Sequence, residues 1–142
     1  MMDQGAARNP DDETLRELLR QTRRIAVVGI SAREERAGCY VPDYLRRRGY
    51  EILPVNPTLA EWQGLRCYAA LAEVPGPLEL VNVFRRSEEA GAVVDQAIAA
   101  GARAVWLQLG VADDAAMRRA RAAGLVAVQD LCLMVEHQRL LR

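Results

Sequence analysis

The chain has 142 residues, of which 51% are hydrophobic and 27% charged, with 19 basic and 19 acidic side chains. This length suits one domain with its own core, and the balanced charge gives no global field to attract nucleic acid or an anionic membrane. Every one of the 19 basic residues is arginine, which excludes a P-loop lysine, a Schiff base and a lysine general base.

The cysteines and the amino terminus bear on the compartment of the protein. Cys39, Cys67 and Cys132 are isolated, lack C-x-x-C spacing and are too few by one to pair completely, which favours reduced thiols. Residues 1–8 are polar, and no apolar run reaches the ~18 residues of a membrane span. We therefore expect a cytoplasmic protein with no membrane or nucleic-acid partner.

Residues 1–9 are predicted to form a loose tail, and residues 10–142 a single domain. Helix-start residues at 10–13 and an apolar stripe that begins at Leu15 predict a first helix ending near Gln21. The apolar run from Arg24 predicts a buried strand at the centre of the sheet, ending at Gly29. A polar loop follows, and Pro42 suits the first turn of the next helix.

The middle of the chain continues the alternation. Residues 50–55 predict a second strand, and residues 58–78 are irregular, with a turn at 62–64, a short strand at 65–68 and one helical turn at 69–73. Residues 78–84 predict another buried strand. Ser87 is then a good N-cap for a helix that ends before Gly101.

Two further strand and helix units complete the chain. Residues 104–109 and 125–129 predict strands, Asp113 or Asp114 caps the helix between them, and Asp130 caps a terminal helix. This alternation predicts an α/β fold: a Rossmann-like, doubly wound parallel sheet with helices on both faces. The expected strand order is 3-2-1-4-5-6, with strand 3 short.

In that order the chain reverses between strands 1 and 4, and open α/β sheets bind ligands in the crevice at such a switch point. Three segments meet there, following strands 1, 2 and 4. The predicted ligand-binding residues are Gly29, Ile30, Ser31, Ala32, Arg33, Glu34, Arg36, Val55, Asn56, Pro57, Asn82, Val83, Phe84, Arg85 and Arg86.

These segments depart from a nicotinamide dinucleotide site. The G-x-G-x-x-G signature would begin at Gly29, but the residues there are Gly-Ile-Ser-Ala-Arg-Glu, with one of the three glycines. The acidic residue that would hold the ribose is also missing, because Asn56 and Pro57 end the second strand.

The same segments carry groups that bind phosphate. Turn amides after Gly29, the Ser31 hydroxyl and arginine guanidinium groups all donate to phosphate oxygens. Arg85 and Arg86 adjoin a helix amino terminus, where a bound anion would relieve an unfavourable dipole; the alternative is pairing with nearby glutamates. Phe84 could contact an adenine or a pantetheine arm, or could fill the core.

No catalytic or metal-binding pattern is present. The single histidine, His137, falls on the inner face of the last helix, which favours packing or capping over catalysis. G-x-S-x-G, H-E-x-x-H and metal-ligand spacings are absent, and Cys132 is more typical of a buried structural cysteine than of a reactive thiol. We expect no enzymatic activity and no metal.

The sequence resembles a known family in several segments that occur in order. It is similar to the small stand-alone bacterial CoA-binding proteins, and through them to the amino-terminal CoA-binding domain of the succinyl-CoA synthetase α-subunit. The matching segments lie between about residues 20 and 141, and they are Ala26-Val27-Val28-Gly29-Ile30-Ser31, Val55-Asn56-Pro57, Asn82-Val83-Phe84-Arg85-Arg86-Ser87, Ala104-Val105-Trp106-Leu107-Gln108 and Glu136-His137.

The resemblance implies a Rossmann-like domain that binds coenzyme A. It implies CoA contacts by Ser31, Ala32, Arg33 and Glu34 and by the end of strand 4, with Arg33 or Arg36 replacing a synthetase lysine that aligns near Leu59. The phosphorylated histidine of the synthetase lies in a further domain, so ligase activity is not implied.

Three hypotheses follow. The first is a non-catalytic module that binds CoA or an acyl-CoA as its small-molecule ligand. The alternatives are a small nicotinamide-dependent oxidoreductase and a CoA-site subunit of a multi-chain acyl-CoA ligase, whose catalytic partner the sequence does not name.

Overall fold

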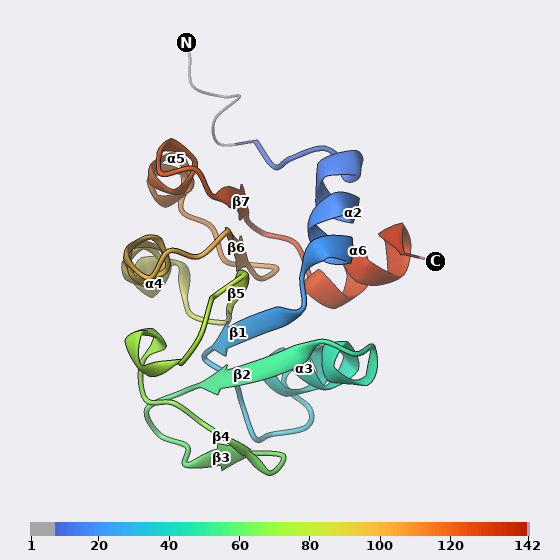
Figure 1. Cartoon of the computed structure of the whole chain (residues 1–142), viewed down its shortest axis with the longest axis vertical. Coiled ribbons are helices and arrows are strands. Elements are labelled where there is room, and N and C mark those ends of the chain that lie inside the picture. The colour runs from blue at the N-terminus through green and yellow to red at the C-terminus, as the bar shows by residue number, and fades with distance from the viewer. Residues whose placement is uncertain (1–7, 142) are drawn as a thin grey trace.

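The computed structural model describes residues 8–141 and shows one parallel sheet between two layers of helices (Figure 1). The elements, in chain order, are α2 (Asp12–Gln21), β1 (Arg24–Val28), α3 (Ala37–Arg47), β2 (Glu51–Val55), β3 (Glu61–Trp62), β4 (Leu65–Arg66), η1 (Leu71–Glu73), β5 (Leu80–Val83), α4 (Ser87–Ala99), β6 (Ala104–Leu107), α5 (Asp114–Ala122), β7 (Val126–Val128) and α6 (Leu133–Leu140).

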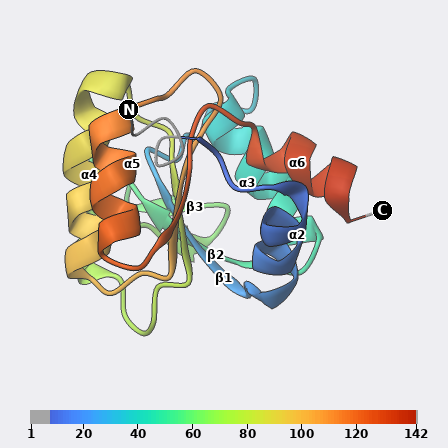
Figure 2. The same ribbon diagram turned by 90° about the horizontal axis from the view of Figure 1, so that it is seen from above.

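The main sheet has five strands in the order β2-β1-β5-β6-β7, and every neighbouring pair in it is parallel. Helices α4 and α5 cover one face, and α2, α3 and α6 cover the other, as the view from above shows (Figure 2). The predicted α/β class, with a Rossmann-like sheet and helices on both faces, is confirmed.

The predicted strand order is wrong at one edge. The short third strand does not join the main sheet: β4 pairs antiparallel with β3, and only a single bridge, Val55 to Tyr68, links this region to β2. Gln63 and Gly64 both have positive φ, at 48° and 80°, which closes a tight hairpin of the type that pairs neighbouring strands. The middle strand of the sheet is consequently β5, and β1 lies second from the edge.

The predicted start of the second helix is also wrong. α3 begins at Ala37, so Pro42 lies inside the helix and not in its first turn. Proline has no amide hydrogen to donate to the carbonyl four residues before it, which is that of Gly38. The Ser31 amide donates to this carbonyl instead, at 3.0 Å, so the helix interior tolerates the proline.

Two predicted helix caps differ in the structure. Ser87 is the first residue of α4 and not its N-cap, and its hydroxyl accepts a hydrogen bond from the Ala112 amide at 3.0 Å. Asp130 does not cap α6, which begins at Leu133; its carboxylate accepts from the Gly110 amide at 2.7 Å. Both side chains thus hold loops together at the carboxyl edge of the sheet.

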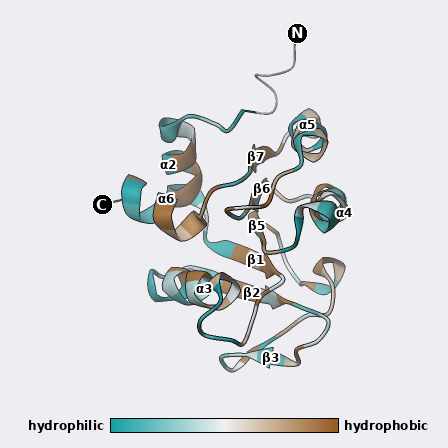
Figure 3. Cartoon of the chain, turned by 180° about the vertical axis from the view of Figure 1, so that it is seen from behind, coloured by the Kyte–Doolittle hydropathy of each residue, from teal (hydrophilic) through white to brown (hydrophobic). Residues whose placement is uncertain are grey.

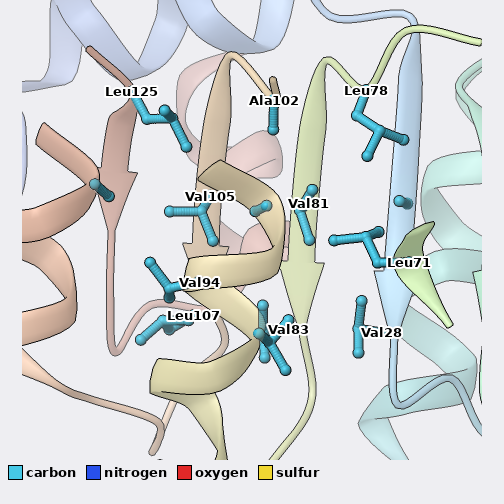
Figure 4. Packing of buried hydrophobic residues seen from close by; sticks show 14 of the residues in the cluster. Val28, Leu71, Leu78, Val81, Val83, Val94, Ala102, Val105, Leu107 and Leu125 are labelled. Carbon is cyan, nitrogen blue, oxygen red and sulfur yellow. The ribbon is translucent and has the colours of Figure 1, made fainter. Parts of the chain in front are cut away.

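Two apolar layers enclose the sheet, and the strands are its most hydrophobic part (Figure 3). Alternate residues of each strand face opposite layers: in β5, Val81 and Val83 pack toward α4, as Figure 4 shows, while Leu80 packs toward the other face. Both faces of the sheet are therefore covered by helices, and the loops at the carboxyl ends of the strands stay accessible to a ligand.

The predicted tail, residues 1–9, lies largely outside the described residues. Asn9 is described, and its side-chain amide both donates to and accepts from the backbone of Gln129, at 2.8 and 2.9 Å. Gln129 directly follows edge strand β7. The two hydrogen bonds therefore satisfy backbone groups that a neighbouring strand would otherwise pair.

The chain segments that follow β1 and β5 approach each other closely at Gly29, and mutation of this residue tests that approach. Its φ is +86°, and a Cβ there would lie 2.5 Å from the Phe84 carbonyl oxygen, whereas Gly101 has a similar φ with no atom in the way. We expect Gly101→Ala to lower the unfolding free energy by roughly 1–2 kcal/mol, the cost of left-handed backbone alone. Gly29→Ala should lower it clearly more, as measured by urea denaturation; equal losses would contradict the close approach.

His137 lies in the packed interface between α3 and α6. Its Nδ1 is 2.9 Å from the Tyr44 hydroxyl, and its ring meets those of Tyr44 and Tyr50 edge to face. Burial, and secondarily the charge of Arg48, lower the pKa of His137 below its ordinary value of 6.5. The Tyr50 hydroxyl donates to the Leu19 carbonyl at 2.7 Å, and burial raises the pKa of Tyr50 to about 12.

The lowered pKa of His137 predicts a pH dependence of stability. Below about pH 6.5 the unfolded chain binds a proton that the folded chain does not, so stability should fall as the pH drops through this window. His137→Gln keeps an acceptor for Tyr44 but does not titrate. The difference in unfolding free energy between parent and variant, measured by urea denaturation from pH 7 to 5, should shrink or reverse toward pH 5; a constant difference would contradict the prediction.

Candidate ligand-binding site

A cleft of about 700 Å³ lies at the carboxyl edge of the main sheet, within the size range of small-molecule sites. It is formed by the loops that follow β1, β2, β5 and β6. Its lining residues are Gly29, Ile30, Ser31, Ala32, Arg33, Arg36, Ala37, Gly38, Asn56, Thr58, Leu59, Phe84, Arg85, Arg86, Gln108, Leu109, Gly110 and Val111.

The loop after β1 is fixed at Ser31 by three neighbours. Its amide donates to the Gly38 carbonyl at 3.0 Å, its carbonyl accepts from the Trp62 indole at 2.9 Å, and its hydroxyl oxygen accepts from the Arg33 amide at 3.1 Å. The amide is thus already used, but the hydroxyl proton remains available to a ligand. Gly38 favours this packing, because a Cβ there would make a tight contact, 3.1 Å, with the Gly29 carbonyl oxygen.

Asn56 joins the loops after β1 and β2. Its amide nitrogen donates to the Ile30 carbonyl at 2.8 Å, and its oxygen accepts from both the amide and the hydroxyl of Thr58, at 2.9 and 2.8 Å. Both polar atoms of the side chain are engaged within the protein. Asn56 therefore shapes the wall of the cleft and offers no free acceptor at the position where a dinucleotide site has its ribose-binding carboxylate.

Four arginines line the cleft, Arg33, Arg36, Arg85 and Arg86, and no aspartate or glutamate is among its described lining residues. Arg33 and Arg86 form exposed ion pairs with nearby glutamates, at 3.1 and 3.4 Å, and such pairs contribute little to stability. Arg36 and Arg85 have no ion-pair partner within residues 8–141. The cleft thus carries an excess of positive charge.

Two helices begin at the cleft without a side-chain cap. The N-cap residues of α3 and α4 are Arg36 and Arg86, and neither side chain accepts from the first turn. By contrast, aspartate side chains cap α2 and α5. The first amides of α3 and α4 therefore keep their hydrogen-bonding capacity, and the positive end of each helix dipole reinforces the arginines. This combination is typical of anion binding.

Gln108 lines the floor of the cleft and is 4% exposed. Its side-chain oxygen accepts from the Leu133 amide at 3.3 Å and from the Asn82 side chain at 3.5 Å. Because the oxygen is held in this way, the amide nitrogen is left as the donor toward a ligand. Asn82 is itself fully buried beneath the cleft, and its own oxygen has no hydrogen-bond partner in the part of the chain described.

The structure brings ten of the fifteen predicted residues into the cleft. They are Gly29, Ile30, Ser31, Ala32, Arg33, Arg36, Asn56, Phe84, Arg85 and Arg86. Val55, Asn82 and Val83 do not line it, because they lie within strands whose two faces are covered by helices. Glu34 and Pro57 are exposed at the outer side of their loops, away from the cleft lining.

The sequence analysis missed eight lining residues, namely Ala37, Gly38, Thr58, Leu59, Gln108, Leu109, Gly110 and Val111. The last four follow β6, where a glutamine and a glycine end an apolar run much as Gly29 and Ser31 follow β1. Gly38 stands four residues before Pro42, and this spacing within a helix marks a carbonyl that needs an outside donor.

The described residues include few side chains placed for catalysis. Residues 8–141 contain no group of three or more histidine, cysteine, aspartate or glutamate side chains placed to hold a metal ion. Cys39 and Cys67 are buried, and burial raises the pKa of both thiols, so their thiolates are disfavoured. His137 lies outside the cleft lining. None of the described helices has the length and apolar character needed to cross a bilayer.

Comparison with models of known protein families shows to which family the chain belongs. A family model for a CoA binding domain matches residues 23–138, which include all four loops of the cleft. The chain belongs to this CoA binding domain family. The predicted resemblance is therefore confirmed, and the domain is a CoA-related binding module.

Similar proteins cover the same length. The uncharacterized protein YneT of Bacillus subtilis is 38% identical over 129 residues, which are 91% of this chain and 96% of YneT. A solved structure of a hypothetical protein from Pyrococcus horikoshii is 38% identical with a TM-score of 0.90 and covers 94% of each chain.

A larger protein shares the fold. The dinucleotide-forming acetyl-coenzyme A synthetase of Ca. Korarchaeum cryptofilum, solved with phosphate and ADP, has a TM-score of 0.71 at 24% identity. The match covers 81% of the CoA binding domain described here but only 28% of the synthetase chain. At this identity the likeness establishes the fold alone.

The role of Asn56 in joining two loops can be tested by mutation. Asn56→Ala removes the donor to Ile30 and the acceptor for Thr58, so we expect the unfolding free energy to fall by roughly 1–3 kcal/mol. The neighbouring substitution Pro57→Ala, at an exposed position that does not line the cleft, serves as the control and should change stability far less. Urea denaturation of both variants measures the difference, and equal losses would argue against the bridging role.

Proposed function

We propose that this CoA binding domain binds coenzyme A or an acyl-CoA in the cleft after Gly29, and that the isolated chain does not transform it chemically. The observation that carries the proposal is the charge of the cleft: four arginines and two uncapped helix amino termini with no carboxylate among its described lining residues. Coenzyme A presents a diphosphate and a ribose phosphate, which match this excess of donors.

The uncharged part of the cleft suits the rest of the ligand. Ile30, Leu59, Phe84, Leu109 and Val111 supply apolar surface, and Leu109 is 65% exposed at the rim. An adenine ring or a pantetheine arm would cover this surface and remove it from water. The side-chain nitrogen of Gln108 is a neutral, buried donor suited to a carbonyl of the pantetheine arm.

A nicotinamide dinucleotide fits the cleft less well. The three-glycine turn is missing, and the Ser31 amide, which would face a diphosphate in such a turn, already donates to Gly38. Asn56 also stands in place of the ribose-binding acid, with its oxygen engaged by Thr58. These features support coenzyme A over a nicotinamide cofactor.

The proposal also states that the isolated chain catalyses no reaction of its ligand. The cleft lining contains no histidine, cysteine, aspartate or glutamate among the residues that the structure describes, so the usual general bases are lacking, and no base in the lining is there to activate the Ser31 or Thr58 hydroxyl as a nucleophile. Purified protein should therefore leave acetyl-CoA and succinyl-CoA intact. Turnover that disappears in Cys132→Ser or His137→Gln would overturn this part.

A thermal-shift comparison tests the ligand itself. Free CoA, acetyl-CoA and NADH are each added at rising concentration, because a ligand at a hundred times its Kd stabilises the folded state by about 2.7 kcal/mol. We expect CoA or acetyl-CoA to raise Tm in a saturable way and NADH to have no such effect. Stabilisation by NADH alone would support the oxidoreductase instead.

A second candidate is that the domain supplies the CoA site to a separate catalytic chain of an acyl-CoA ligase. The shared fold with 28% of an acetyl-coenzyme A synthetase chain supports it, since the rest of such an enzyme would reside elsewhere. Affinity purification from the source organism at native expression level tests this candidate. Recovery of the domain without a ligase-like chain would count against it.

Arg85 and Arg86 provide the sharpest test of where the phosphates lie. A hydrogen bond to a charged group contributes roughly 1.5–3 kcal/mol, so losing one should weaken CoA binding about tenfold to a hundredfold. We expect Arg85→Ala to have the larger effect, because Arg85 is half-buried and without an ion pair, whereas Arg86 is paired with Glu89. The double variant should also flatten the salt dependence of the affinity.

Isothermal titration at two salt concentrations measures these effects. Arg103→Ala, an exposed arginine outside the cleft, is the matched control and should bind CoA like the parent. Fold stability should change little in the Arg85 and Arg86 variants, because arginines at a helix amino terminus oppose the dipole, and little in Arg103→Ala, because that side chain is exposed. If the double variant binds like the parent with the same salt slope, the phosphates lie elsewhere, with Arg33 and Arg36 as the remaining cations of the cleft.

A further inference from the structure

A second pocket, of about 250 Å³, lies at the opposite edge of the sheet, beside the amino-terminal ends of β1 and β2. Three helices end there: α2, α3 and α6. The pocket is lined by Leu19, Arg20, Thr22, Arg23, Arg48, Gly49, Tyr50, His137 and Leu141. Three arginines thus surround a small cavity, and its described lining contains no aspartate or glutamate.

The carbonyl groups at these helix ends are already satisfied by other donors. Leu18 receives both the amide and the hydroxyl of Thr22, and Leu19 receives the hydroxyl of Tyr50. At the end of α3, following backbone amides close the last turn; at the end of α6, the Leu141 amide donates to the His137 carbonyl and the Arg16 guanidinium donates to the Leu140 carbonyl at 3.1 Å. The arginines of the pocket are therefore not consumed as C-caps, and their guanidinium groups keep their donors.

The three arginines also lack ion-pair partners among the carboxylates of residues 8–141. Arg47, in the middle of the triplet that ends α3, pairs with Asp43 at 3.1 Å, but its neighbour Arg48 instead lies over the Tyr44 ring, 5.0 Å from its centre. Arg20 and Arg23 form no ion pair with any residue in the range 8–141. This absence contrasts with other arginines among residues 8–141, which form seven ion pairs.

His137 provides a buried polar wall to the same pocket. Its side chain is more than nine-tenths buried, and Nδ1 is engaged with the Tyr44 hydroxyl at 2.9 Å. The second ring nitrogen, Nε2, has no hydrogen-bond partner in the described part of the chain and can donate from the wall of the cavity. A histidine so placed offers a donor that is less solvated than the arginines around it.

From this arrangement we propose that Arg20, Arg23, Arg48 and His137 form a binding site for a small oxyanion such as phosphate, separate from the CoA cleft. The cavity is smaller than typical sites for drug-sized ligands, which favours inorganic phosphate or the phosphate end of a small metabolite. Guanidinium groups match the geometry of phosphate oxygens, and three arginines line this pocket.

Helix dipoles explain only part of this charge. The carboxyl end of a helix carries roughly half a negative elementary charge, so three such ends offset about half of the three arginine charges. A net positive charge remains around the cavity: no described carboxylate lines it, although the Glu79 carboxylate accepts from the Arg23 backbone amide at 2.6 Å. A dianion would complete the balance.

The single histidine of the chain makes the proposal directly testable by nuclear magnetic resonance. In protein labelled with ¹³C and ¹⁵N, the imidazole resonances of His137 report on this pocket alone. Inorganic phosphate is titrated at constant ionic strength, with chloride as the balancing salt. We expect a saturable shift of the His137 resonances in phosphate, little or none in chloride, and a higher pKa of His137 when phosphate is bound.

Variants separate this site from the cleft, which itself attracts phosphate. Arg20→Gln combined with Arg48→Gln should weaken the phosphate dependence of the His137 signals at least tenfold, while Arg33→Gln combined with Arg36→Gln in the cleft should leave it unchanged. Arg23→Gln alone, at an exposed position, serves if the first pair does not fold. Sulfate and acetate arms distinguish a tetrahedral dianion, which should bind, from a planar carboxylate, which should bind more weakly.

Two outcomes would overturn the proposal. One is a linear, non-saturating shift, or an equal shift in chloride, which would mean an adventitious ion only. The other is a shift that the cleft variants abolish and the pocket variants retain. Neither depends on CoA, so failure of CoA binding and failure of this site are distinguishable.

Discussion

The hydrogen bond from the Ser31 amide to the Gly38 carbonyl is the contact on which the geometry of the cleft depends. Pro42 leaves that carbonyl without its helical donor, and Gly38 lets the loop approach closely enough to supply one. The loop after β1 is thereby fastened to α3, and Trp62 fastens it to the β3-β4 hairpin from the other side. Strand, helix and hairpin together fix the position of one loop.

This constraint changes how the cleft can bind phosphate. In a glycine-rich dinucleotide turn the loop amides themselves face the phosphates, but here the Ser31 amide is used internally. Under the proposed function, phosphate recognition would pass to arginine side chains and to the first amides of α3 and α4. The departure from the glycine signature and the abundance of arginine in the cleft thus have one physical explanation.

The fold class could be predicted from the sequence because buried parallel strands give apolar runs and the helices between them give 3.6-residue periodicity. The site could be predicted in part, since Gly29, Phe84 and Arg85 follow strands directly. The turn at 62–64 and a short strand after it could also be predicted, but the antiparallel pairing of that strand with Glu61–Trp62 could not, because two-residue strands leave no periodic pattern. Gln108 was missed because its role depends on β6 lying beside β5 and on the buried Asn82, which are properties of the tertiary fold.

In helix α3, arginine has opposite effects on helix stability at the amino and carboxyl ends. At its amino terminus Arg36 stands against the positive end of the dipole, which costs about 0.3–1 kcal/mol, so helix stability cannot account for a cation there. At its carboxyl terminus Arg48 complements the negative end and stabilises the helix even without a ligand. An anion at the cleft is therefore the stronger inference from charge alone, whereas the pocket at the other end depends on the additional features of three arginines that form no ion pair within residues 8–141 and of the buried His137.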